Sequence, residues 1–125
     1  MSGFRSHRDL PVYQDSFQNA REIFQLSKKF PREELYSLTD QIRRSSRSVC
    51  ANVGEAWRKR RYERLFVSTL NIAEAEAAET QVWLEFALNC EYIPSDQFAE
   101  LFDAYEHVIS QLVYLIHNPT RWILK

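Results

Sequence analysis

Residues 39–64 read TDQIRRSSRSVCANVGEAWRKRRYER, and this stretch decides which fold the chain can adopt. Within it and just before it, apolar or small side chains recur every three or four residues, the spacing of one helix face. Glu33 and Glu34 favour a helix start, because carboxylates are stabilised in the first turn of a helix. We therefore expect a helix from about residue 33 to about residue 58, whose buried face comprises Leu35, Leu38, Ile42, Ser45, Val49, Val53 and Ala56.

A first helix is expected upstream of this one. Asp9 is a suitable cap for its start, and Phe30-Pro31 should end it, since a residue before proline is pushed out of the helical conformation. Apolar positions alternate in steps of four and three along the segment. The predicted buried face comprises Tyr13, Phe17, Ala20, Phe24 and Ser27, with Ile23 and Phe30 beside it.

Two more helices follow. The third should end near Glu91, and its predicted seam is Phe66, Leu70, Ala73, Ala77, Thr80, Leu84 and Ala87. The fourth should be capped by Ser95 and end before Pro119, with a face made of Phe98, Leu101, Phe102, Tyr105, Val108, Ile109, Leu112, Leu115 and Ile116. Four helices with short connections indicate an all-α, antiparallel up-down-up-down four-helix bundle. We expect one domain over residues 1–125, with tails at 1–9 and 119–125.

The composition agrees with this fold class. The chain has 125 residues, enough to bury a core, and only two glycines and four prolines, too few for a loop-rich or all-β fold. Residues 1–10 are polar, so we expect no signal peptide, and no apolar run of about 18 residues could span a bilayer. Two cysteines without metal-like spacing favour reduced thiols, so we expect a cytoplasmic protein with no membrane partner.

The charges are distributed unevenly along the chain. The formal net charge is only −1, but residues 43–64 hold eight basic and two acidic side chains, a local net of +6. Residues 65–120 hold no Lys or Arg and nine acids. Such asymmetry indicates a charged partner, or one part of the protein attracting another. The eight basic residues are Arg43, Arg44, Arg47, Arg58, Lys59, Arg60, Arg61 and Arg64.

Enzymatic sites are not indicated. A di-iron bundle requires Glu-x-x-His on two helices, and none of the three histidines follows a Glu at that spacing. Cys50 lies close to Arg47, which in principle lowers a thiol pKa, but a structural role is favoured because no histidine and third group accompany it. No glycine-rich loop exists to hold a phosphate. We therefore predict no catalytic residues, no metal and no cofactor.

The outward face of the second helix has a distinctive pattern. At about 100° per residue, Arg43, Arg44, Arg47 and Arg58 point away from the core of the bundle. Cys50, Ala51 and Gly54 fall on the same side, so the middle of this face is nearly bare. Gln41 and Asn52 lie at the edge of the buried face, where amides commonly bond across helices or to a loop. We therefore predict structural roles for both.

Three interpretations of this face remain open. The arginines form a solvated surface, in part paired with Glu74, Glu76 and Glu79 of the next helix. Alternatively, the bare patch receives a helix from another copy of the chain, so that the basic part of one subunit meets the acidic part of the next. In the third interpretation the face binds nucleic-acid phosphates, with Trp57 or Tyr62 available for stacking on bases.

The same residues carry a family resemblance. Phe30-Pro31, Glu34, Tyr36-Ser37-Leu38-Thr39, Gln41-Ile42-Arg43-Arg44, Ser48-Val49, Ala51-Asn52-Val53 and Glu55 resemble, in order and spacing, one family of four-helix bundles. It is named from reading frames in intervening sequences of large-subunit ribosomal RNA genes. That name reflects gene location and assigns no ribosomal function. The likeness extends over about residues 9–116 and gives Glu55 a structural place in the pattern.

The resemblance implies a bundle that associates into a ring, most simply a homopentamer. The family includes, more distantly, the accessory variability protein of diversity-generating retroelements, a basic pentameric barrel that works with a reverse transcriptase and its RNA. This chain departs from the family in two places. Cys50 stands where many members have proline, which implies a straighter second helix, and Ala56-Trp57 replaces a glycine that ends that helix in many members.

Together these observations predict a non-enzymatic, self-assembling bundle. Its leading partner, besides other copies of itself, is RNA or a nucleic-acid enzyme bound to RNA, held by the eight basic residues of helix two and the junction with helix three. The alternative is a pure assembly or scaffold protein whose arginines pair with acidic residues of neighbouring helices or subunits.

Overall fold

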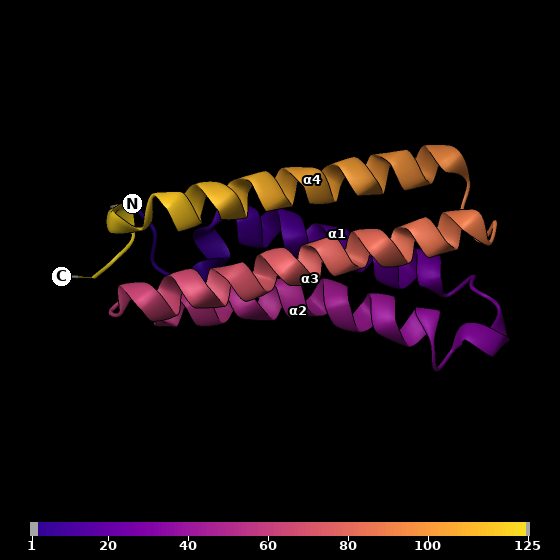
Figure 1. Ribbon diagram of the computed structural model, residues 1–125, viewed down its shortest axis with the longest axis horizontal. Helices are drawn as coiled ribbons and strands as arrows, with labels where there is room; N and C mark the ends of the chain where they lie inside the picture. The colour runs from indigo at the N-terminus through magenta and orange to yellow at the C-terminus, as the bar shows by residue number, and fades with distance from the viewer. Residues whose placement is uncertain (1–2, 125) are drawn as a thin grey trace.

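Four long helices dominate the computed structural model, which describes residues 3–124 (Figure 1). The helices are α1 (Pro11–Ser27), α2 (Leu38–Arg58), α3 (Glu63–Asn89) and α4 (Ser95–His117). Three short 3-10 turns accompany them: η1 (His7–Asp9), η2 (Arg32–Glu34) and η3 (Pro119–Arg121). Residues 3–124 contain no strand.

The helices form an antiparallel bundle. Each helix packs against the next one in the chain, and α4 packs back against α1. In Figure 1 the colour gradient, which follows residue number, runs one way along each helix and the opposite way along the next. Successive helices therefore run in opposite directions. The predicted all-α up-down-up-down bundle is thereby confirmed. Among residues 3–124, no helix combines the length and the apolar character that crossing a membrane would require.

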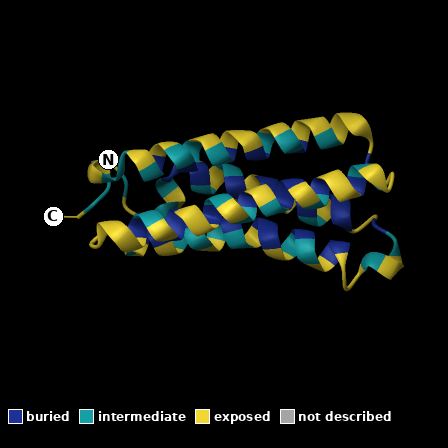
Figure 2. Cartoon of the chain, in the orientation of Figure 1, coloured by how far each residue is buried: buried dark blue, intermediate teal, exposed yellow. Residues whose placement is uncertain are grey.

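The inward faces of α2, α3 and α4 follow the sequence pattern closely (Figure 2). Every residue of the predicted α3 seam, from Phe66 to Ala87, is buried. On α2, Ile42, Val49 and Val53 have no exposed surface, whereas the predicted Leu35 lies outside the helix and is exposed. Tyr105 is fully buried in the middle of α4. These three helices therefore bury the stripe that their 3.6-residue period marks.

The predicted buried face of α1 is only partly right: Ile23, Ser27 and Phe30 are buried as expected, but Tyr13, Phe17, Ala20 and Phe24 are not. The residues that α1 buries are Val12, Ser16, Asn19, Ile23, Leu26 and Ser27. Phe17 is 49% exposed, and Tyr13, Ala20 and Phe24 are only half-buried. Two stripes one position apart interleave along α1, and the bundle buries the one that contains the small polar residues Ser16 and Asn19. Ser16 can be buried because its hydroxyl donates to the Val12 carbonyl oxygen.

Several helix ends also differ from the prediction. Helix α2 begins at Leu38 rather than near residue 33, and Glu33 and Glu34 lie in the separate turn η2. Glu34 still serves the helix start, because its Oε1 accepts hydrogen bonds from the Leu38 N–H at 3.3 Å and the Ser37 hydroxyl at 2.7 Å. Helix α1 ends at Ser27, three residues before Phe30-Pro31.

At the other helix starts the predicted caps are replaced. Asp9 belongs to the short turn η1 and does not cap α1: Ser6 is the N-cap of η1, and the Asp9 carboxylate accepts from the N–H groups of Arg5 and Ser6. Ser95 is the first residue of α4 and makes no capping hydrogen bond, because Pro94 occupies the cap position. Helix α3 ends at Asn89, and Glu91 takes the left-handed conformation with φ of 62°.

The predicted tails are packed where the structure describes them. The rings of Phe4 and Trp122 stack with centroids 5.4 Å apart, so the two ends of the chain meet. The Leu124 N–H donates to the Arg60 carbonyl oxygen at 3.0 Å, which ties the C-terminal segment to the turn between α2 and α3. Residues 1, 2 and 125 of those tails lie outside the described residues.

Candidate functional site in the groove between α1 and α2

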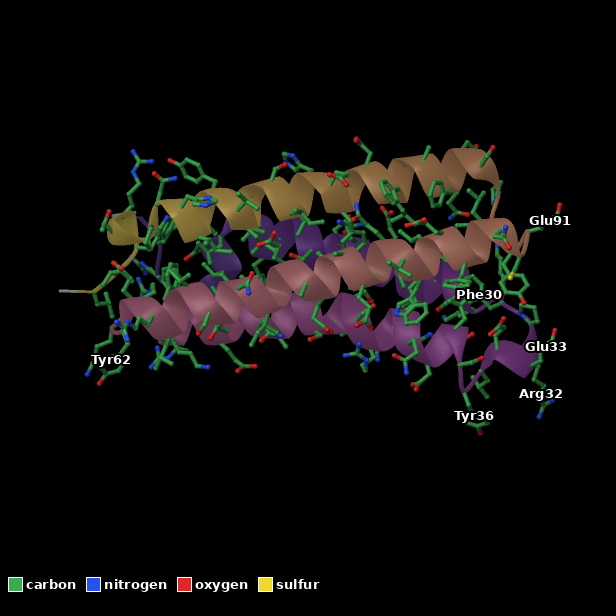
Figure 3. All side chains as sticks on the ribbon, viewed as in Figure 1. Phe30, Arg32, Glu33, Tyr36, Tyr62 and Glu91 are labelled. Carbon is green, nitrogen blue, oxygen red and sulfur yellow. The ribbon has the colours of Figure 1, made fainter. Side chains whose placement is uncertain are left out.

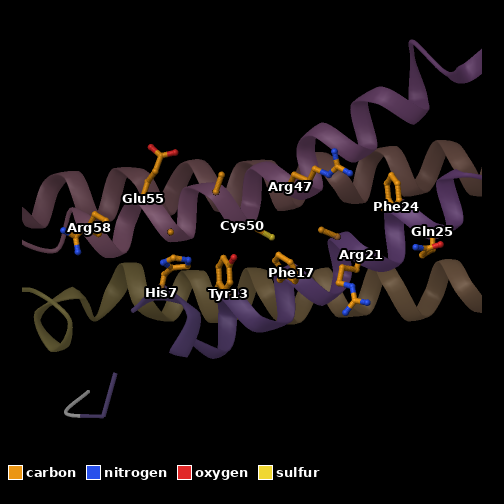
Figure 4. Close-up of a pocket in the computed structure, with 13 residues that line it drawn as sticks. His7, Tyr13, Phe17, Arg21, Phe24, Gln25, Arg47, Cys50, Glu55 and Arg58 are labelled. Atoms are coloured by element: carbon orange, nitrogen blue, oxygen red, sulfur yellow. The ribbon is translucent and has the colours of Figure 1, made fainter. Parts of the chain in front are cut away.

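An open groove of about 800 Å³ runs between α1 and α2 (Figure 4). One wall comes from the aromatic stripe that α1 leaves outside the core, formed by Tyr13, Phe17, Ala20 and Phe24. The other side comes from α2, where the small residues Cys50, Ala51 and Gly54 offer almost no side chain. The groove therefore joins the bare patch predicted on the second helix to an aromatic wall that the sequence pattern placed in the core.

The turn η1 contributes His7 to the groove lining, beside Gly54. The His7 ring lies edge-on to the Tyr13 ring, with centroids 4.7 Å apart. The same ring covers Gly54, since a Cβ built on that glycine would lie 3.7 Å from His7 Cδ2. The N-terminal segment therefore packs against α2 at Gly54, at a distance that leaves room for a Cβ in ordinary van der Waals contact.

Cys50 is part of the groove wall and not an activated nucleophile. It is half-buried, and its S–H donates to the Ser46 carbonyl oxygen at 3.8 Å. Burial raises the pKa of the Cys50 thiol to about 11, so the thiol is uncharged at neutral pH. The pKa lowering that proximity to Arg47 could in principle produce is therefore contradicted.

Cationic side chains line the rim of the groove. Arg21 of α1 and Arg47 and Arg58 of α2 all border it. The Arg47 guanidinium carbon lies 5.3 Å from the centroid of the Phe24 ring, and that of Arg43 lies 4.7 Å from the same centroid. Such cation–π contacts hold a guanidinium group over an aromatic face without neutralising its charge. The groove thus has an apolar interior and a positive rim.

Four of the eight predicted basic residues are engaged within the chain. Arg43 donates from Nε to the Ser27 hydroxyl at 2.8 Å, linking α2 to α1. Arg44 forms ion pairs with both Glu76 and Glu79 of α3.

The other two engaged residues lie at the end of α2. Lys59 donates to the Thr69 hydroxyl at 3.3 Å and lies 3.9 Å from the Glu55 carboxylate. Arg60 stacks on the Trp57 ring at 3.5 Å and donates to the Trp57 carbonyl oxygen. These two side chains support the helix end instead of offering charge to a partner.

The remaining basic residues do not form one continuous face. Arg47 and Arg58 belong to the groove rim, whereas Arg61 and Arg64 are exposed at the turn between α2 and α3. Beside them Tyr62 is 59% exposed and lies at one end of the bundle (Figure 3). Within residues 3–124, no carboxylate lies within 4.0 Å of any of these four arginines. The predicted surface therefore comprises a groove rim and a corner, formed by Arg58, Arg61, Tyr62 and Arg64, and Arg58 belongs to both.

The three predicted structural residues make local contacts. Asn52 donates to the Ser48 carbonyl oxygen at 2.9 Å within α2, where bonds across helices or to a loop were expected. Gln41 Oε1 accepts from Arg44 Nε at 3.4 Å, also within α2. Glu55 is exposed and borders the groove. Each therefore acts on its own helix, and none bridges to a neighbouring helix.

Sequence reasoning missed half of the groove. Arg21, His7 and the aromatic residues of α1 were not expected to share a site with α2, because the aromatic stripe was assigned to the core. One signal was available: Arg21 follows Phe17 by four residues and so lies directly above it on one helix face. A charged residue at that spacing indicates that the stripe reaches solvent.

The described residues hold no grouping suited to metal catalysis. Between residues 3 and 124, no three His, Cys, Asp or Glu side chains come together in a way that could hold a metal ion. The groove itself offers apolar and aromatic side chains in its lining together with the guanidinium groups of Arg21, Arg47 and Arg58.

Comparison with known proteins places this arrangement in a family. A family model described as 23S rRNA-intervening sequence protein matches residues 8–114. A crystal structure of a protein of unknown function from the S23 ribosomal protein family of Bacteroides thetaiotaomicron VPI-5482 is similar, with a TM-score of 0.76 and 32% sequence identity. The match covers 84% of this chain and 97% of that protein. No curated protein matches the chain. The chain belongs to the 23S rRNA-intervening sequence protein family.

Proposed function

We propose that this chain is a cytoplasmic, non-enzymatic protein that assembles with copies of itself through the groove between α1 and α2. The observation that carries the proposal is the exposed aromatic wall: Phe17 leaves about half of its surface uncovered beside a floor of small residues. Large continuous apolar surfaces on a folded protein mark sites of association. The free thiols of Cys50 and Cys90 are consistent with a reducing compartment.

The groove is better suited to a protein helix than to a nucleic acid. Its interior is aromatic and aliphatic, and the small residues on α2 permit the close axis-to-axis approach of a packed helix. Three arginines, Arg21, Arg47 and Arg58, stand in a mainly uncharged lining that also includes Glu55, which is less basic than the grooves that follow nucleic-acid backbones. The homopentamer implied by the family resemblance is the assembly that we expect.

A single substitution in the groove tests this proposal. Ala51→Arg places a long cationic side chain on the exposed floor without disturbing the core, because Ala51 is exposed on α2. Native mass spectrometry should show that the variant loses the assembly formed by the wild type. The matched control is Ala99→Arg, the same change at an exposed position of α4 outside the groove, which should assemble normally. Unchanged assembly of the Ala51→Arg variant would refute the proposed role of the groove.

A second function, RNA binding at the corner formed by Arg58, Arg61, Tyr62 and Arg64, is favoured by a separate observation. Those three arginines have no carboxylate within ion-pair distance among residues 3–124, and the exposed Tyr62 ring can stack on a base. This proposal retains the corner part of the basic surface predicted from sequence and leaves out the four residues engaged within the chain.

RNA titrations at several salt concentrations test the corner. Each phosphate contact to a single strand contributes a slope of about −0.7 in log affinity against log salt, so three contacts give about −2. Arg61→Glu with Arg64→Glu should reduce both the affinity and this slope, whereas Arg44→Glu, at a residue paired with α3, should change the slope little. Equal effects of the two sets of substitutions would contradict a specific role for the corner.

A further inference from the structure

A small cavity of about 230 Å³ lies where α1, η2 and α2 meet, at the end of the bundle where Phe30 and Arg32 are labelled in Figure 3. Among the described residues that line it, three are cationic, Lys28, Arg32 and Arg43, and none is an Asp or a Glu. Thr39 adds a hydroxyl group. The cavity shares no lining residue with the groove between α1 and α2 or with the corner.

We propose that this cavity binds a phosphate group, either as free phosphate or as part of a small organic ester. Its volume suits such a ligand. A water molecule occupies about 30 Å³ in the liquid, so the cavity has room for one tetrahedral phosphate and a few water molecules. Pockets for drug-sized ligands are larger, at about 300–1,000 Å³. We call this site the phosphate cavity, and its ligand binding is independent of the assembly proposed for the groove.

Arg43 is held in a position to bind a phosphate. Its Nε donates to the Ser27 hydroxyl at 2.8 Å, and its guanidinium carbon lies 4.7 Å from the centroid of the Phe24 ring. These two contacts orient the guanidinium group, whose two terminal amino groups have no acceptor among residues 3–124. Paired N–H groups of this kind match two oxygens of a phosphate. The bond to Ser27 therefore positions Arg43 and leaves its charge available.

Lys28 and Arg32 add positive charge that no carboxylate neutralises. Lys28 Nζ lies 4.8 Å from the centroid of the Phe24 ring, so Lys28 and Arg43 hold like charges beside one aromatic ring. In the part of the chain that the structure describes, none of the three cations has a carboxylate oxygen within 4.0 Å. The neighbouring Glu34 carboxylate does not line the cavity and already accepts three hydrogen bonds. Like charges held together raise the energy of the folded chain, and a bound anion offsets that cost.

The first turn of α2 supplies further donors. Thr39 is 4% exposed and lines the cavity, and its hydroxyl makes no hydrogen bond among residues 3–124. A hydroxyl group enclosed in this way favours a ligand that can accept from it. The backbone N–H groups of Thr39 and Asp40 also have no acceptor within those residues, and the Ser37 side chain does not cap the helix. The positive end of the helix dipole favours an anion at this place.

The C-terminal end of α1, which meets the same cavity, does not oppose an anion strongly. Open carbonyl groups at a helix C-terminus carry partial negative charge and would repel a phosphate. Here the N–H groups of residues 28–30 donate to the carbonyl oxygens of residues 25–27. The cavity therefore combines a helix start that attracts an anion with a helix end whose carbonyl groups are already engaged.

Calorimetric titration of the full chain with inorganic phosphate, in a chloride buffer of constant ionic strength, tests this proposal. The wild type should bind one phosphate per chain. Arg43→Met should weaken binding about 10- to 100-fold, the usual contribution of hydrogen bonds to a charged group. Thr39→Val, which removes the cavity hydroxyl and keeps every cation, should weaken it about three- to tenfold. The matched control is Arg61→Met, which removes one arginine charge at the corner and should bind phosphate as the wild type does.

Glycerol 3-phosphate distinguishes the two sources of the phosphate group. Tighter binding than inorganic phosphate would identify a small ester as the ligand, and equal or weaker binding would identify free phosphate. Circular dichroism should show the wild-type helix signal for each variant, and Thr39→Val tests the site even if loss of the Arg43–Ser27 contact unfolds the chain.

Three results would overturn the phosphate cavity. The first is no binding of either ligand above the chloride background. The second is an equal loss of binding in Arg61→Met and Arg43→Met, or no loss in Thr39→Val and Arg43→Met, because attraction to the whole basic segment would then explain the binding. The third is an affinity for RNA alone that Arg43→Met reduces, because the cavity would then belong to a nucleic-acid surface. None of these results changes the assembly expected at the groove.

Discussion

The Arg44 guanidinium group on α2 lies 2.9 Å from a carboxylate oxygen of Glu76 on α3, and it also pairs with Glu79. Arg44 stands near the start of the segment that looks most like a basic recognition surface. The structure instead uses it to connect two neighbouring helices. A local excess of positive charge in a sequence therefore does not measure how much charge a partner can reach.

Replacing Arg44 by Met should reduce the free energy of unfolding only slightly, by about 0–1 kcal/mol, because exposed ion pairs are weakened by solvent. The side chains of Arg44, Glu76 and Glu79 are 47%, 16% and 32% exposed, so solvent reaches both pairs from the arginine side. Urea denaturation of the variant measures the change. Arg61→Met, at an exposed arginine of the corner, should leave the unfolding free energy unchanged, and a loss above about 2 kcal/mol for Arg44→Met would show that the pair is stronger than exposed pairs usually are.

Stability should depend on pH through Glu34. Hydrogen bonds from Ser37 and Tyr92 hold the pKa of Glu34 below its usual value of 4.5, and the bond to Glu34 raises the pKa of Tyr92 to about 12. A carboxyl group with a lowered folded-state pKa stabilises the fold above its unfolded-state pKa, and that contribution is lost as the pH falls through the folded-state value. The chain should therefore lose stability as the pH drops below about 4.5.

Tyr92→Phe tests this linkage. The variant should unfold at lower urea concentration than the wild type at pH 7, and the difference should shrink as the pH falls below the pKa of Glu34, because a protonated carboxyl group accepts more weakly. Tyr36→Phe, at a side chain that is 90% exposed, is the matched control and should show no such pH dependence. A difference for Tyr92→Phe that stays constant from pH 7 to pH 3 would rule out the role of the Glu34 charge.

Cys50 should resist alkylation at pH 8. With a pKa of about 11, only about one Cys50 thiol in a thousand is ionised at that pH, and the thiolate is the reactive form. Peptide mapping after brief iodoacetamide treatment should find Cys90, which is exposed, modified well before Cys50. Urea should abolish this difference. Equal rates in the folded protein would mean that Cys50 is more accessible than its position in the groove allows.

Tyr105→Phe should leave the fold as stable as before or stabilise it by up to about 1 kcal/mol, because a buried polar group without a partner is costly. The Tyr105 hydroxyl is enclosed in the core and finds no hydrogen-bond partner among residues 3–124. Tyr105→Ala is the contrasting variant and should cost about 3–5 kcal/mol through the cavity it leaves. Thermal unfolding of both variants distinguishes the contribution of the hydroxyl from that of the ring. A marked loss of stability on removing the hydroxyl alone would indicate a partner for it.

The sequence predicts most of this fold because three helices each carry one dominant apolar stripe. The α3 seam from Phe66 to Ala87 is buried without exception, as its steps of three and four require. On α1 two stripes interleave, and periodicity cannot decide between Phe17 and the neighbouring Ser16. The choice depends on how closely α1 packs against α2 and α4, which is a property of the assembled bundle.

The candidate site shows the same limit. A bare patch at Cys50, Ala51 and Gly54 can be recognised from the sequence, because the size of a side chain does not depend on tertiary structure. The aromatic wall facing them was not predicted, because the aromatic residues of α1 were expected to lie in the core. The partners of the arginines also depend on distances between helices, so the pairing of Arg44 with Glu76 could be offered only as one of several alternatives.

The mass of the wild-type chain in solution tests the central claim most directly. Native mass spectrometry or light scattering at micromolar concentration should report a single species at an integer multiple of 14.9 kDa, with five copies as the expected number. Ala51→Arg should return that species to one chain, while Ala99→Arg should not. A wild-type protein that remains at 14.9 kDa across this concentration range would contradict the account.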